Sequence, residues 1–268
     1  MMFEWMNYSF MINALAAAII AAPIFAILGT MVISNKMAFY TDVIGHSTLT
    51  GIAIGVLFGI TDPAWFMALF LVFLAIGINY FKTKTKASAD TVLGVFFAFV
   101  VALGIVILSR NGGFARYTSY LIGDVLTVSL EEIYILAGLL FLTIAYFFIA
   151  SNSLYLISIN RSLAMTRKVN VFWAETSFTI LLGLVVAFSI KMVGILIINS
   201  LIILPAAAAR VLAKDIKSYT FYSIGISVIS SILGIISSFY IGIASGATIV
   251  LFASAIYALS VMSKKIFK

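Results

Sequence analysis

The sequence predicts an all-α, polytopic membrane protein with eight or nine transmembrane helices. Hydrophobic residues make up 64% of the 268 positions and charged residues only 9%, whereas an average soluble protein is about 25% charged. The apolar residues form long runs, such as 92–108 and 176–188, and about 20 residues cross the hydrocarbon layer as a helix. Membrane barrels alternate apolar and polar residues instead. The composition therefore excludes a soluble enzyme, a nucleic-acid-binding module and a disordered scaffold.

Nine candidate spans follow one another without a linker or a soluble insertion, so we expect residues 1–268 to form one transmembrane domain. The links near 34–38 and 190–191 are short, and eight spans remain the alternative. In chain order the candidate spans cover 11–33, 39–60, 63–81, 91–109, 131–150, 172–189, 192–211, 218–239 and 246–262.

The three prolines give expectations about individual spans. Asp62-Pro63 is typical of a helix N-cap followed by proline at the first helical position. Pro23 and Pro205 lie inside spans, where proline kinks a helix. Pro205 is therefore a candidate hinge, with a static kink as the alternative.

Basic residues predict the orientation of the chain. They fall in four regions separated by pairs of spans, so all four can share one face, which the positive-inside rule assigns to the cytoplasm. The C-terminus is then cytoplasmic, although Arg110 and Arg116 on the expected outer side disagree with the pattern. The four regions contain Lys82, Lys84 and Lys86, then Arg161, Arg167 and Lys168, then Arg210, Lys214 and Lys217, and finally Lys264, Lys265 and Lys268.

The span 39–60 carries the candidate chemistry. His46 is the single histidine of the chain and follows Asp42 by four residues, so the two side chains share one helix face. Ionisable residues in spans usually face a cavity, and a carboxylate oxygen and an imidazole nitrogen are suitable ligands for a divalent transition metal. The alternative is a hydrogen bond inside the bundle without a role in transport. On the opposite side, Gly51, Gly55 and Gly59 indicate close helix packing.

We interpret the remaining acidic residues as loop or interface residues. Glu175 and Lys191 lie near span ends, where long side chains reach the membrane interface, and Arg210 suits the C-terminus of its helix. The expected outer loop and its border contain Asp124, Glu131 and Glu132.

Several motifs of catalysis are absent from the sequence. It contains no cysteine and no G-x-x-x-x-G-K-[ST], H-E-x-x-H or G-x-S-x-G pattern, so it neither binds ATP as a P-loop protein nor matches these hydrolase classes. We expect a transporter subunit without a permanently bound cofactor. A secondary transporter with Asp42 and His46 as a proton relay, a membrane enzyme and a structural scaffold are the alternatives.

Four ordered motifs resemble those of the membrane permeases of bacterial zinc/manganese ABC transporters. The segment Asp42-Val-Ile-Gly-His46-Ser resembles the family's D-x-x-x-H-[AS]. The other three are Y-L-I-G-D ending at Asp124, V-G-I-L-I-I-N-S-L-I-I-L-P-A-A-A-A-R ending at Arg210, and S-G-A-T starting at Ser245. The resemblance covers nearly the whole chain, and within the family the high-affinity zinc uptake permease is most similar.

The resemblance implies a fold related to the cobalamin and siderophore importers and a homodimer in the bacterial inner membrane. It also implies two cytoplasmic ATP-binding subunits, an extracytoplasmic metal-binding protein and no nucleic-acid partner. Asp42 and His46 match the family's metal-contact positions, with Zn²⁺ as the transported ion and Mn²⁺ or iron as alternatives.

The segment 158–170 matches the family's helix that meets the ATPase. This family commonly has acidic residues and a Gly-Val pair there, and their replacement by basic residues predicts weaker coupling or a compensating charge on the ATPase. The candidate coupling residues are Asn160, Arg161, Leu163, Ala164, Arg167 and Lys168.

Overall fold

The computed structural model describes residues 4–59, 64–110, 123 and 125–266, and within these ranges every regular element is a helix. The expected cap at Asp62-Pro63, the residue Arg116 and the candidate Asp124 lie outside the described residues. In chain order the helices are η1 (Glu4–Asn7), α1 (Ser9–Ser34), α2 (Ala38–Leu57), α3 (Ala64–Lys84), α4 (Ala89–Arg110), η2 (Val125–Thr127), α7 (Leu130–Ile159), α8 (Arg161–Thr166), α9 (Val171–Val193), α10 (Ile195–Leu212), α11 (Ile216–Ile241) and α12 (Ser245–Ile266).

Seven helices in the described part of the chain are long and apolar enough to cross a membrane, namely α1, α3, α4, α7, α9, α11 and α12. Helix α10 is shorter, and its apolar stretch covers Ile197–Leu212. Helix α2 has 20 residues, but Asp42, His46 and several threonines lower its hydropathy. Both α2 and α10 are largely buried among other helices, so neither needs a fully apolar surface.

Each of the nine candidate spans corresponds to a separate long helix in the described ranges. The chain breaks between α1 and α2, and again between α9 and α10, so the helices on either side of each short link are separate. The second break lies at Gly194 rather than near 190–191, because Gly194 has a φ of 81°, a left-handed conformation that favours glycine. Helix α7 continues to Ile159, nine residues beyond the expected end at 150.

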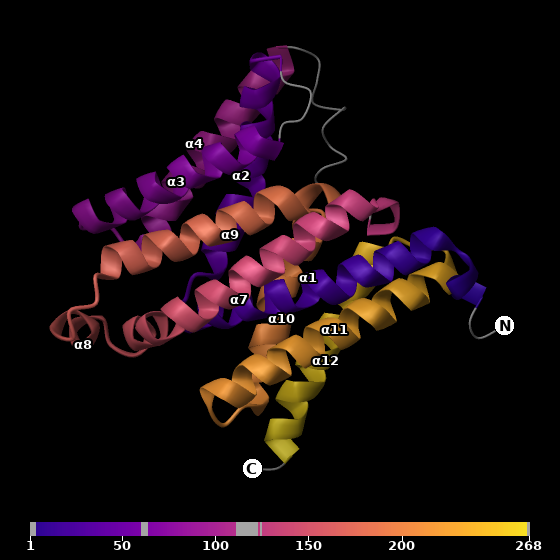
Figure 1. Ribbon diagram of the computed structural model, residues 1–268. Helices are drawn as coiled ribbons and strands as arrows, with labels where there is room; N and C mark the ends of the chain where they lie inside the picture. The colour runs from indigo at the N-terminus through magenta and orange to yellow at the C-terminus, as the bar shows by residue number, and fades with distance from the viewer. Residues whose placement is uncertain (1–3, 60–63, 111–122, 124, 267–268) are drawn as a thin grey trace.

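The long helices form two groups that meet along α2, α9 and α10 (Figure 1). In the first group α2 contacts α3 and α4, and α9 packs along α3. In the second group α1 contacts α7, α10 and α11, and α12 packs on α10 and α11. Because α10 also contacts α2 and α9, it joins the two groups and lies at the centre of the bundle.

Two glycines meet where the chain enters η2. A Cβ atom placed on Gly123, whose φ is 63°, would overlap the backbone of Val193 and Gly194. The backbone before η2 therefore lies directly on the break between α9 and α10.

Two of the expected basic regions meet at one residue. Lys82 at the end of α3 and Arg161 at the start of α8 both bind Glu175. In a third region, Arg210 at the end of α10 donates a hydrogen bond to the Ile33 carbonyl at the end of α1, at 3.2 Å. The placement of all four regions on one cytoplasmic face stays a prediction.

Candidate functional site

Helix α2 is held against neighbouring helices on three sides. Gly51 lies on α3, where an added Cβ would be 2.8 Å from Met67 Cα. The Thr50 hydroxyl donates to the Val100 carbonyl of α4 at 2.6 Å. Gly45 lies on α10, where an added Cβ would be 3.1 Å from the Ile195 side chain. Close contacts of this kind fix the rotation of α2 about its axis, and with it the direction of the remaining face.

That remaining face carries Asp42 and His46. The exposed or partly exposed residues of the first three turns are Ala38, Phe39, Asp42, His46 and Leu49, and their spacing puts them in one stripe along the helix. The His46 ring packs edge-on against Phe97 of α4, with 5.6 Å between the ring centroids. The two candidate ligands therefore share an accessible intramembrane face, and their role as metal contacts stays a prediction.

Asn199 of α10 is a third polar residue at this site, and sequence reasoning missed it. Its Nδ2 donates a hydrogen bond to Asp42 Oδ1 at 2.7 Å. The side chain is only 8% exposed, and its Oδ1 has no hydrogen-bond partner in the described part of the chain. The one signal in the sequence was an asparagine within the otherwise apolar run I-L-I-I-N-S-L-I-I-L.

Gly45 makes this contact between α2 and α10 possible. A Cβ at Gly45 would lie 3.3 Å from both the Nδ2 and the Oδ1 of Asn199. The amide therefore lies directly against the α2 backbone, one turn from Asp42.

One chain provides few metal ligands of the usual types. No group of three or more His, Cys, Asp or Glu side chains that could hold a metal occurs among the described residues. A closed structural zinc site needs four ligands, and Asp42 and His46 of one chain are two.

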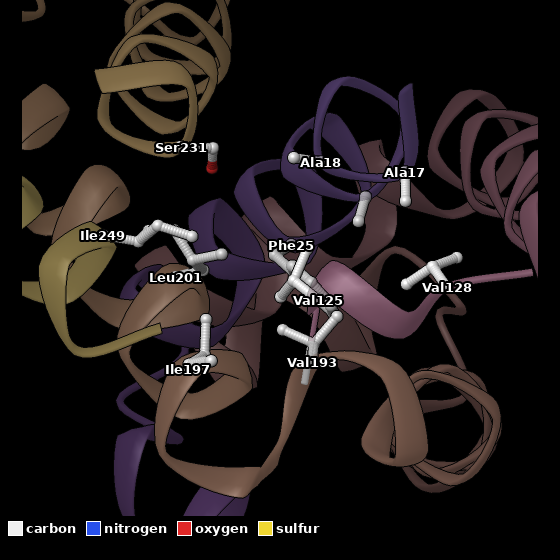
Figure 2. A pocket seen from close by; sticks show the side chains of 11 residues that line it. Ala17, Ala18, Phe25, Val125, Val128, Val193, Ile197, Leu201, Ser231 and Ile249 are labelled. Atoms are coloured by element: carbon white, nitrogen blue, oxygen red, sulfur yellow. The ribbon is translucent and has the colours of Figure 1, made fainter. Parts of the chain in front are cut away.

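A small cavity elsewhere in the bundle is apolar and contains neither Asp42 nor His46 (Figure 2). It lies between α1, η2, the end of α9, α10, α11 and α12, and Ser231 is the only polar side chain in its lining. The lining residues are Ala17, Ala18, Ala21, Phe25, Val125, Val128, Val193, Ile197, Leu201, Ser231 and Ile249. With one hydroxyl and ten apolar side chains, this cavity offers no ligand set for a cation.

The candidate coupling segment forms a short helix at one extreme of the molecule (Figure 1). Asn160 caps α8, because its Oδ1 accepts a hydrogen bond from the Leu163 backbone N–H at 3.1 Å. Ala164 is fully buried in a small cluster with Ile157 and Val171. Every residue from 160 to 168 except Ala164 is exposed, and these residues include the apolar Leu163 and Met165 and the basic Arg167 and Lys168.

Glu175 anchors this segment to the membrane helices. Its carboxylate is 3.0 Å from Lys82 Nζ of α3 and 3.0 Å from Arg161 Nη1 of α8, and the residue is only 6% exposed. The interpretation of Glu175 as an interface residue was therefore wrong, since its side chain points into the bundle. Lys191 does lie at the surface, where it pairs with Glu132 at 3.2 Å.

Pro205 is buried in the middle of α10, and the helix is continuous across it. Pro23 lies in the same way within a continuous α1. Neither observation tests whether Pro205 acts as a hinge.

Comparison with known proteins gives three consistent findings. A model of the ABC 3 transport family matches residues 7–264. The high-affinity zinc uptake system membrane protein ZnuB of Buchnera aphidicola subsp. Schizaphis graminum is 33% identical, covering 89% of this chain and 92% of that protein. The manganese transport system membrane protein MntC of Halalkalibacterium halodurans is 29% identical, covering 96% and 88%.

A solved structure also matches over nearly the full length. PsaBC from Streptococcus pneumoniae, solved in complex with Fab, superimposes with a TM-score of 0.84 at 27% identity, covering 97% of this chain and 95% of that one. The expected all-α permease fold is therefore confirmed.

Proposed function

The chain belongs to the ABC 3 transport family, and from that premise we propose that it carries Zn²⁺ across the bacterial inner membrane as the permease subunit of an importer. The observation that supports an intramembrane ion site is the accessible stripe of α2, which presents a carboxylate and an imidazole together. Zinc is favoured because imidazole nitrogen is a preferred zinc ligand and because ZnuB is 33% identical. Manganese is the second candidate, supported by the similarity to MntC.

In this proposal Asp42 and His46 replace part of the ion's water shell for the duration of its passage. The negative charge of Asp42 offsets the electrostatic cost of a dication inside the membrane. Two protein ligands and residual water bind less tightly than four fixed ligands, which lets the ion leave again.

We further propose that the permease works as a homodimer, with the α2 stripe of each chain facing a shared pathway. A carboxylate and an imidazole partly exposed to hydrocarbon are unfavourable, so this face needs a polar cover. A second copy supplies one and brings the ligand set to two aspartates and two histidines.

The energy source in this proposal is a pair of separate ATP-binding subunits, since this chain has no P-loop. The segment 160–168 is the proposed contact, because it carries exposed apolar and basic side chains on a helix anchored through Glu175. An ATPase surface with an apolar centre surrounded by acidic side chains would be complementary to this segment. Pro205 is the proposed hinge of α10 in the switch between outward and inward states.

An extracytoplasmic metal-binding protein delivers the ion in this scheme, and the C-terminus lies in the cytoplasm with the basic helix ends. The test is uptake of single metals into vesicles that contain the permease and its ATPase, with the binding protein added. We expect ATP-dependent Zn²⁺ uptake. Uptake that is equal with and without ATP would contradict the proposal.

A further inference from the structure

We propose that Asn199 is a third metal contact of each chain, whose amide holds Asp42 while the pathway is empty and presents its carbonyl oxygen to the ion when the ion arrives. This inference rests on the proposed function and adds a ligand that the D-x-x-x-H segment does not contain. The donor set of one chain then consists of two oxygens and one nitrogen.

The first support is the unsatisfied oxygen. Asn199 is buried, with an exposed fraction of only 8%. A buried hydrogen-bond acceptor without a partner costs free energy. No partner for Asn199 Oδ1 exists in the described part of the chain. A cation that binds Asn199 Oδ1 would be the partner that this oxygen lacks.

Burial of an unpaired amide oxygen is not sufficient by itself, as Asn79 shows. Asn79 is also buried with an unpartnered Oδ1, but its Nδ2 donates to the neutral hydroxyl of Thr179 at 2.8 Å, between α3 and α9. Asn199 differs because its partner is a carboxylate on the accessible stripe of α2. Only Asn199 combines an unsatisfied oxygen with a neighbouring anionic ligand.

The second support is the geometry of the amide and the carboxylate. Asn199 Nδ2 and Asp42 Oδ1 are 2.7 Å apart, and a half-turn of the amide exchanges its nitrogen and oxygen, which have nearly the same size. The carbonyl oxygen would then lie beside the carboxylate oxygen. Two oxygens this close repel each other unless a cation binds both, so the ion itself drives the turn.

The same exchange favours release of the ion. Before binding, the ion must displace the N–H group from Asp42, so it binds less tightly than it would if the amide oxygen already faced the pathway. When the ion leaves, the N–H group returns and pairs with Asp42 again. A carrier needs this reversibility, whereas a storage site does not.

The inference also predicts metal preference. Carbonyl and carboxylate oxygens suit Mn²⁺, whereas imidazole suits Zn²⁺. Removing the Asn199 oxygen should therefore weaken Mn²⁺ uptake more than Zn²⁺ uptake.

The experiment measures initial uptake rates of radioactive Mn²⁺ and Zn²⁺ into vesicles with the full permease–ATPase complex. The variants are Asn199→Leu, Asn199→Asp and the matched control Asn79→Leu. For Asn199→Leu we expect the KM for Mn²⁺ to rise about tenfold, with a smaller rise for Zn²⁺. For Asn199→Asp we expect tighter binding and slower turnover, because the added charge holds the ion, and Asn79→Leu should leave both KM values unchanged.

Unchanged KM values for both metals in Asn199→Leu, in a complex that His46→Ala inactivates, would overturn the inference and leave the proposed function standing. Equal changes in Asn199→Leu and Asn79→Leu would also overturn it, because they would indicate general destabilisation. If Asn199→Leu does not reach the membrane, binding of Mn²⁺ to solubilised Asn199→Asp decides: tighter binding supports the contact, and unchanged binding refutes it.

Discussion

Asp42 and Glu175 are both carboxylates within the helical bundle, but their surroundings differ. Glu175 is surrounded by two cations, each 3.0 Å away, and is almost completely buried. Asp42 is partly exposed and pairs with one neutral amide at 2.7 Å. The difference teaches that a fully neutralised carboxylate fixes structure, whereas a carboxylate without a cation beside it keeps the capacity to bind one.

The largest expected effect comes from removing the imidazole beside Asp42, which tests whether this carboxylate belongs to an ion site. We predict that His46→Ala abolishes metal uptake, because it removes the only nitrogen ligand that this chain can offer. Uptake by reconstituted vesicles is the measurement, and recovery of the variant with its ATPase in detergent is the control for folding. Normal uptake rates would refute the role of the stripe.

Glu175→Gln tests the opposite side of the comparison. The change leaves Lys82 and Arg161 without their shared carboxylate, and we expect unfolding in detergent to become easier by about 2 kcal/mol, a value reduced from that of a fully buried pair because Arg161 is partly exposed. ATP hydrolysis stimulated by the binding protein should also fall, since α8 loses its anchor. Thermal unfolding and ATPase assays measure the two effects.

Lys191→Ala is the matched control for Glu175→Gln. It removes one member of the surface pair with Glu132, and exposed pairs contribute under about 1 kcal/mol. If both variants unfold alike, Glu175 has no special structural role.

Gly45→Ala is a milder test of the surroundings of Asp42, and we expect it to have a smaller effect on metal uptake. The new methyl group would lie 3.3 Å from the Asn199 amide, so the amide must shift by a few tenths of an ångström. We expect the KM for metal uptake to rise about fivefold with little change in stability. Gly138→Ala is the control, because a Cβ there meets open space.

Asp215 is a third carboxylate for this comparison, and it lies in solvent rather than inside the bundle. This carboxylate caps α11, and the hydrogen bond from the Ser218 backbone N–H, at 2.8 Å, lowers the pKa of Asp215 below its usual value. A lowered pKa means that the cap stabilises α11 above the unfolded pKa of about 3.9 and loses this effect as the pH falls through the folded pKa. The protection of the first-turn amides of α11 against hydrogen exchange, measured relative to the intrinsic exchange rate at each pH, should therefore fall in acid.

Asp215→Asn separates this titration from the capping bond. Asparagine also caps helices but does not titrate, so the acid-dependent loss of protection should disappear. If it persists in the variant, another group is responsible.

The sequence predicted helices well because a span that faces lipid has to be apolar over its own length, and because the two buried helices, α2 and α10, are still mostly apolar. The positions of α1 to α4 and α9 to α12 follow from such local runs, and Asp42 and His46 share a face because they are four residues apart. Family resemblance then directed attention to that pair.

Contacts between distant segments could not be predicted in the same way. Asn199 and Asp42 are 157 residues apart. The residue pattern of either span does not indicate which face of α2 packs against which face of α10. Glu175 was misjudged because position along a span indicates depth but not direction. The break at Gly194 was misplaced by three residues or more because the backbone conformation of a glycine decides where the helix ends, and an apolar run does not indicate it.

The contact between Gly123 and Gly194 has a consequence for the history of the chain. Because a side chain on Gly123 would collide with the turn at Gly194, that position cannot mutate while the facing backbone stays as it is. Related chains should therefore either retain glycine there or show altered spacing in both segments at once. An aligned set of sequences would reveal this as correlated substitution, and a grafted segment that includes Gly123 should work only when it is transferred together with the matching turn at Gly194.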